Sequence, residues 1–162
     1  MKTYILSIIA CALAVSGLSA APQPRDFRLS VKADGKSSYD KDAVTQSRKL
    51  ELSLSLAGKE SAPDVVVKWT IYGHTRKDNA VVVIKSGELK ASLEPGKTAT
   101  LTIPEVTING VREHSVSTGS GRSRRAKKVP ASGEEYFGYS VVLMYGSALV
   151  AEIYSKPSLK GK

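Results

Sequence analysis

The side chains that could do chemistry in this chain are basic ones, and they lie in one short run. The run comprises Arg122, Arg124, Arg125, Lys127 and Lys128, and Gly119 and Gly121 come just before it. Such a cluster can neutralise phosphates, sulfates or acidic sugars, and nearby glycines let the backbone adapt to a partner. The same composition is typical of a solvated surface loop, or of a loop that proteases cut outside the cytoplasm, so both interpretations stay open.

The positive charge of the chain is concentrated in this run. The formal net charge is +9, and it falls to +8 if Lys2 is removed with a leader peptide. Five of those eight charges belong to the run, which leaves the rest of the mature chain near +3. The expected partner is therefore an acidic glycan, lipopolysaccharide or another acidic surface polymer. Nucleic acid is disfavoured, because no aromatic side chain for base stacking lies within the run.

Signatures of catalysis, of a cofactor or of a metal site are missing from the sequence. His74 and His114 fall in different predicted loops, with no carboxylate or thiol at ligand spacing. Asp40 and Asp42 are too few oxygen ligands for a calcium loop. Residues 119–122 resemble a phosphate-binding loop only in composition, since no strand and helix flank them. We therefore predict a non-enzymatic protein without cofactor or metal.

The first 20 residues predict a secretory signal peptide. Lys2 supplies a positive start, residues 4–15 are mostly apolar, and small residues lead to a cleavage site after Ala20. The apolar stretch is too short for a membrane span. The mature chain is therefore expected to be exported, without a transmembrane segment, to the periplasm, the outer membrane or the cell surface.

Cys11 is the only cysteine, and it lies within this leader. Residues 8–11 resemble a bacterial lipobox, in which the cysteine would carry a lipid, although the apolar run continues to Val15. As part of a cleaved leader, Cys11 would leave the mature chain without a thiol or a disulfide. The lipidated alternative stays open.

The elements that must position the basic run are strands. Apolar and polar residues alternate over residues 50–56 and 65–72, which is the period of a half-buried strand. The second segment contains Trp69, the only tryptophan, whose ring can bury roughly 150–250 Å². We expect two sheets to close over this ring, with the alternating leucine, valine and isoleucine positions as the core.

About eight short strands are predicted in total, with no helix in the mature chain. They fall at residues 27–31, 50–56, 65–72, 81–84, 88–93, 98–103, 134–145 and 148–154. Turn signals stand at residues 86–87, 94–97, 109–110 and 146–147. Residues 34–46 are expected to form a polar loop, and residues 114–133 a long, mobile, basic loop.

This pattern predicts an all-β fold, an antiparallel β-sandwich of the immunoglobulin type, as a single domain over residues 21–162. The strands at residues 50–56, 65–72 and 137–145 fall in the order of immunoglobulin strands B, C and F. Residues 81–84 and the last strand are candidate sheet edges, to which another copy could add strands. Lys85, Lys90 or the C-terminal tail would instead blunt these edges, and this alternative is equally open.

Four segments together resemble small exported proteins of verrucomicrobial bacteria, some of them abundant at the outer membrane and linked to type IV pilus genes. The segments are residues 67–74, 82–87, 131–139 and 153–159, and the likeness spans about residues 27–159. The resemblance implies an immunoglobulin-like surface or pilus-associated protein, with itself or pilus components as partners and no catalytic residues. A pilin-type leader with its long apolar helix is missing from the sequence, so a major pilin subunit is not expected.

Overall fold

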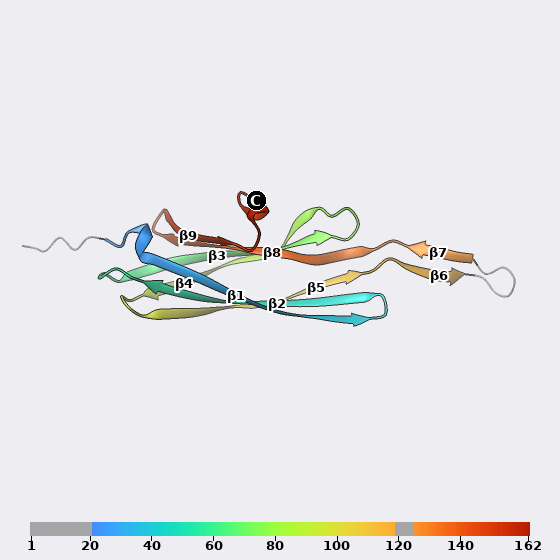
Figure 1. Ribbon diagram of the computed structural model, residues 1–162, viewed down its shortest axis with the longest axis horizontal. Coiled ribbons are helices and arrows are strands. Elements are labelled where there is room, and N and C mark those ends of the chain that lie inside the picture. The colour runs from blue at the N-terminus through green and yellow to red at the C-terminus, as the bar shows by residue number, and fades with distance from the viewer. Residues whose placement is uncertain (1–20, 119–124) are drawn as a thin grey trace, which may run out of the picture.

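The chain folds into antiparallel β-strands with no α-helix in the part described (Figure 1). A computed structural model describes residues 21–118 and 125–162, so the predicted leader, Cys11, Arg122 and Arg124 lie outside the described residues. Its strands are β1 (Phe27–Asp40), β2 (Ala43–Leu56), β3 (Ala62–Thr75), β4 (Val81–Leu93), β5 (Thr98–Val111), β6 (His114–Thr118), β7 (Arg125–Val129), β8 (Ser132–Tyr145) and β9 (Ala148–Tyr154). Two short 3-10 helices, η1 (Pro24–Asp26) and η3 (Pro157–Leu159), flank them.

The strands form two layers, which confirms the predicted all-β sandwich. One layer has the order β1-β2-β5, and the other has the order β9-β8-β3-β4. In immunoglobulin lettering these are A-B-E and G-F-C-C′, so the predicted B, C and F strands are β2, β3 and β8. β8 also joins the layers at one end, where Gly133 and Ser132 pair with Gly110 and Val111 of β5.

The core lies between the layers and contains the alternating residues that the sequence indicated. Trp69 is 5% exposed and sits at the centre of β3. The fully buried side chains around it include Leu50, Leu52, Leu54, Val65, Val67, Ile71, Ile103, Val141 and Leu143. The period-2 pattern of β2 and β3 therefore corresponds to one face against the core.

Two predicted turns are wrong, because their glycines lie inside long strands. Gly87 belongs to β4 and faces Trp69, and a Cβ atom there would lie 2.7 Å from the ring atom Cζ2. Gly110 belongs to β5, and the Arg76 side chain passes over it. A Cβ atom at Gly110 would lie 2.6 Å from the Nε atom of Arg76. The predicted turns at residues 94–97 and 146–147 are confirmed, with Gly96 and Gly146 at φ +71° and +59°.

The predicted polar loop over residues 34–46 is instead the end of a long β1–β2 hairpin. The strands pair up to Asp40 and Ala43, with Lys41 at φ +50° in the turn. Only Val44 and Gln46 of this stretch turn inward, and they are 2% and 8% exposed. Because the rest of the hairpin end is polar, its strand pattern is weak in the sequence.

The predicted loop over residues 114–133 is also corrected, because it contains β6, β7 and the start of β8. β6 and β7 pair antiparallel from His114 with Val129 to Thr118 with Arg125, as a separate two-stranded sheet. We call this pair of strands the basic ribbon. It extends beyond the sandwich at the end opposite η1 (Figure 1). Because no core lies beneath the ribbon, its strands need no apolar face, and the sequence therefore lacks the alternation that would predict them. The predicted mobility of this segment stays a prediction.

Candidate functional site: a projecting basic ribbon

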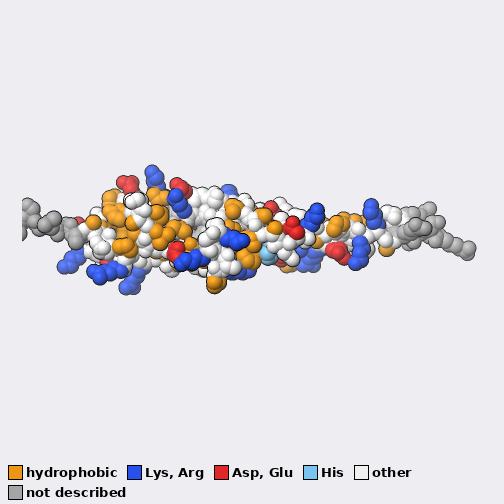
Figure 2. All heavy atoms as spheres, turned by 90° about the horizontal axis from the view of Figure 1, so that it is seen from above, with side chains coloured by type: hydrophobic (Ala, Val, Ile, Leu, Met, Phe, Trp, Pro, Cys, Tyr) orange, Lys and Arg blue, Asp and Glu red, His pale blue; other side chains and the backbone are white. Residues whose placement is uncertain are grey.

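The structure places the described members of the basic run on β7. Arg125 is the first residue of β7, opposite Thr118, while Lys127 and Lys128 lie opposite Val116 and Ser115. Since neighbouring residues of a strand point to opposite faces, the two lysines lie on different faces of the ribbon. Figure 2 accordingly shows basic side chains on both sides of this narrow extension.

Both lysines remain accessible to solvent. The Lys128 ammonium lies 3.1 Å from the Glu113 carboxylate, and these side chains are 79% and 59% exposed. A pair this exposed contributes only about 0–1 kcal/mol, so a more acidic partner can replace it. On the other face, Lys127 is exposed beside Val116, which is 42% exposed. That face therefore presents an exposed apolar side chain next to a basic one.

The β1–β2 turn braces the ribbon where it leaves the sandwich. The Arg112 guanidinium stacks 4.4 Å from the centroid of the Tyr39 ring, and the Arg112 amide donates to the Asp42 carbonyl at 2.8 Å. His114, the first residue of β6, has Nδ1 3.8 Å from the Asp42 carboxylate and 3.0 Å from the Arg112 carbonyl. These contacts connect β6 to the β1–β2 hairpin.

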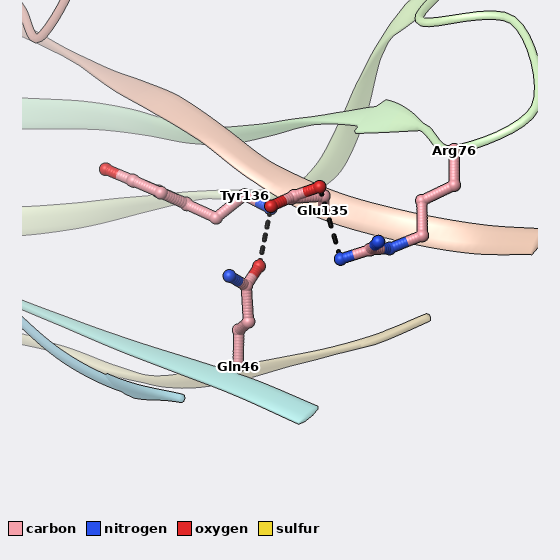
Figure 3. Close-up of polar contacts among 4 residues, drawn as sticks. All are labelled: Gln46, Arg76, Glu135 and Tyr136. Carbon is pink, nitrogen blue, oxygen red and sulfur yellow. Dashed lines mark hydrogen bonds and ion pairs between the residues drawn. The ribbon is translucent and has the colours of Figure 1, made fainter. Parts of the chain in front are cut away.

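A partly buried polar cluster fixes the other side of the base, where the chain returns into β8 (Figure 3). The Gln46 Oε1 atom on β2 accepts a hydrogen bond of 2.8 Å from the Tyr136 amide on β8. Arg76, at the end of β3, lies 3.1 Å from the Glu135 carboxylate, and its amide donates to the Gly133 carbonyl at 3.0 Å. Immediately after the ribbon, β8 is therefore bonded both to β2 in one layer and to the end of β3 in the other.

Tyr136, beside this cluster, is half-buried. Burial raises the pKa of Tyr136, and the positive charge of Arg48 acts in the opposite direction. The Arg48 guanidinium lies 4.5 Å from the centroid of that ring. Sequence reasoning missed Gln46, Arg48, Arg76 and Glu135, because single polar residues far apart in the chain carry no signal of a shared location.

The base of the ribbon is also hollowed. An open depression of 570 Å³ is lined by Thr75, Lys77, Asn109 and residues 130–134. It brings the β3–β4 turn, the end of β5 and the start of β8 to one place. This size suits part of a partner that also touches the ribbon.

The two histidines are not brought to a common site in the described structure. The His74 ring packs 4.8 Å from the Phe137 ring, whereas His114 contacts Asp42 and Arg112. Across residues 21–118 and 125–162, no group of three or more histidine, cysteine, aspartate or glutamate side chains is placed to hold a metal ion. Within the same ranges, none of the helices has the length and apolarity needed to cross a membrane.

β4 and β9 are sheet edges, as the sequence predicted. The pairing of β4 with β3 shifts register opposite Ile71 and Tyr72, and Lys85 at this irregularity is exposed. Irregular pairing and an exposed lysine both hinder addition of a further strand. The outer side of β9 lies near β1. The structure thus favours blunted edges over edges that recruit strands.

Comparisons with known proteins find similar folds at very low identity. No family model and no curated protein matches the chain. The solved structural genomics target SoR45 is 12% identical with a TM-score of 0.41, over 86% of this chain and 93% of that one. A structure from the verrucomicrobial bacterium Akkermansia muciniphila is 12% identical with a TM-score of 0.34, over 84% and 74%. A β-glucosidase from Kluyveromyces marxianus is 13% identical with a TM-score of 0.30, over 80% of this chain and 14% of the enzyme. At these values the likenesses assign no activity, partner or location, and this chain is an all-β sandwich whose role must be argued from its own surface.

Proposed function

We propose that this chain is a non-enzymatic, exported interaction and assembly protein of the cell surface, associated with pili. The observation that supports this role is the basic ribbon, which extends beyond the sandwich as a sheet of its own. An isolated two-stranded sheet is only marginally stable in water. A ribbon that reaches away from the core, and is braced at its base, suits contact with another molecule.

The proposed location is the outer membrane, the periplasm or the cell surface. It rests on the predicted leader over residues 1–20 and on the resemblance to exported verrucomicrobial proteins. The proposed partners are other copies of this chain or pilus components. η1, near the start of the described chain, lies at the opposite end from the ribbon (Figure 1). A chain held near its N-terminus would therefore present the ribbon outward.

The assembly role is tested by the molecular mass of residues 21–162 in light scattering, over a range of protein and salt concentrations. We expect a defined oligomer whose proportion rises with protein concentration. It should persist in high salt, because salt screens exposed charges but not apolar contacts between copies. A monomer at every concentration would contradict self-assembly and would leave only heterologous partners.

A second candidate function is electrostatic binding of acidic glycan or lipopolysaccharide through the basic run. It is favoured by the exposure of Lys127 and Lys128 on opposite faces of the ribbon. A flexible polyanion can contact both faces at once. Binding of this kind weakens steeply with salt, because counter-ions screen exposed charges over about 8 Å at physiological ionic strength.

Replacing the five residues Arg122, Arg124, Arg125, Lys127 and Lys128 by serine is expected to abolish retention on heparin or immobilised lipopolysaccharide. The control removes the same charge from the sandwich, by serine substitutions at the exposed lysines Lys36, Lys49, Lys59, Lys85 and Lys90. The control should keep most of its retention because the ribbon is intact. Equal losses in the two variants would mean that net charge, not the ribbon, governs binding.

A further inference from the structure

The segment after β9, residues 155–162, lies on the outer face of the second layer (Figure 1). Leu159 in this segment is fully buried, and Tyr72 on β3 is 4% exposed. Neither side chain belongs to the core between the layers. Tyr72 follows the core residue Ile71 in the strand, so it points to the opposite face, toward the segment. The segment thus forms a second, separate apolar contact.

Gly138 shapes the groove in which the segment lies. It is opposite Tyr72 in the β3–β8 pairing and is itself buried. A Cβ atom at Gly138 would lie 2.9 Å from Leu159 Cδ1, and closer still to the Ser155 hydroxyl oxygen. Contacts this short would force the Ser155 and Leu159 side chains to shift, so a side chain at residue 138 would disturb the docked segment. Because glycine has no side chain, residue 138 leaves the space that the Leu159 side chain occupies.

Polar contacts hold the two ends of the segment. The Ser155 amide donates to the Tyr139 carbonyl at 2.9 Å, and the Tyr139 amide donates to the Ser155 hydroxyl at 2.7 Å. At the other end, the Lys160 ammonium lies 2.7 Å from the Glu152 carboxylate, and this hydrogen bond lowers the pKa of Glu152. The segment is thus held by one backbone hydrogen bond, one hydrogen bond to the Ser155 hydroxyl, a buried apolar anchor and an ion pair. Main-chain hydrogen bonds combined with a pocket for a side chain are how sheets recognise peptides.

Residues 155–162 are anchored to the sheet at one point. Leu159 is the only buried residue among residues 155–162, and the other seven are exposed. One anchor in one glycine groove forms the centre of the contact, and the groove itself belongs to β3 and β8. Its contacts are the same whichever copy of the chain supplies the segment.

We propose that the groove formed by Tyr72, Gly138 and Ser140 is a peptide-binding site that accepts residues 155–162 of a second copy in place of its own. Ser140 completes the groove, since it is 6% exposed and its hydroxyl lies 3.4 Å from that of Tyr72. Exchange of a terminal segment joins protomers without new surfaces. This rests on the assembly role proposed above and names one contact that joins the copies.

Two variants of residues 21–162 test the exchange. Gly138→Ala crowds the groove but keeps the Leu159 anchor, whereas Leu159→Ala keeps the groove but removes the anchor. Neither variant can fill the site with its own copies. When they are mixed, the segment of the Gly138→Ala chain should enter the groove of the Leu159→Ala chain. We expect light scattering to show, in the mixture alone, a one-to-one complex absent from either variant by itself.

The controls separate this exchange from other contacts. The Gly138→Ala/Leu159→Ala double variant should not form the complex with either partner. Adding the five ribbon-to-serine substitutions to the Gly138→Ala chain should leave the complex intact, so failure of ribbon binding and failure of exchange are distinguishable. If both single variants show native circular dichroism and Trp69 fluorescence but form no complex, the proposal is overturned.

A peptide assay keeps the test decisive if Gly138→Ala does not fold. A fluorescent peptide with the sequence of residues 155–162 is titrated into the Leu159→Ala chain and followed by anisotropy. We expect saturable binding that weakens about tenfold or more when the peptide leucine is replaced by alanine, because the buried anchor is lost. Equal binding of the two peptides would overturn the proposal.

Discussion

Replacement of Trp69 by alanine is expected to lower the free energy of unfolding by about 3–5 kcal/mol. The ring is 5% exposed and lies between Gly87 of β4 and Val141 of β8 in the β3 pairings. Small domains have a total stability of roughly 5–15 kcal/mol, so this loss is a large share of it. Urea unfolding followed by circular dichroism measures the effect, since the variant has no tryptophan to report by fluorescence.

The matched control is Leu149→Ala, which removes a large apolar side chain from an exposed position. Leu149 is 49% exposed on the edge strand β9, and its replacement should change stability by no more than about 0.5 kcal/mol. A Trp69→Ala variant as stable as Leu149→Ala would contradict the central position assigned to the ring.

Gly133→Ala is expected to destabilise the fold by roughly 2–6 kcal/mol, from backbone strain and crowding together. Gly133 has φ +76°, and a Cβ atom there would lie 2.5 Å from the Asn109 carbonyl oxygen and 2.8 Å from Gly110 Cα. Both neighbours are backbone atoms of β5, so relief requires β8 to move away from β5. Urea unfolding of the variant measures the cost.

Gly146→Ala separates the two contributions. Gly146 also has a positive φ, +59°, but nothing lies within 4 Å of the position of its Cβ atom. This control carries only the left-handed backbone penalty of about 1–2 kcal/mol. If the two variants were equally stable, crowding at the junction of β5 and β8 would have no part in stability.

The sandwich could be predicted from the sequence wherever one face of a strand is apolar. Residues 50–56 and the Trp69 strand alternate strictly, and the structure buries the predicted faces. The turns at Gly96 and Gly146 were predictable because glycine there adopts a positive φ. Gly87 and Gly110 were misinterpreted, because each makes room for a side chain from another part of the chain, Trp69 on β3 and Arg76 in the turn after β3. A single sequence does not show such contacts.

The position of the candidate site could be predicted from the sequence, but its three-dimensional arrangement could not. The basic run stood out by composition, and the structure places its described part on a strand. The ribbon was missed because a sheet without a core under it needs no apolar face. The cluster of Gln46, Arg76 and Glu135 joins residues far apart in the chain, and the groove around Gly138 has its ligand in another segment. These features depend on tertiary contacts alone.

The double membership of β8 has a mechanical consequence. The ribbon leads directly into β8, whose first residues are hydrogen-bonded to β5 and whose remaining length is bonded to β3. A pull on the ribbon therefore enters the sandwich through β5 and β8, the two strands that continue into it, and β8 is bonded to both layers. The load is shared across the two sheets along their strands, and it cannot peel one layer from the other without first breaking the seam at Gly133.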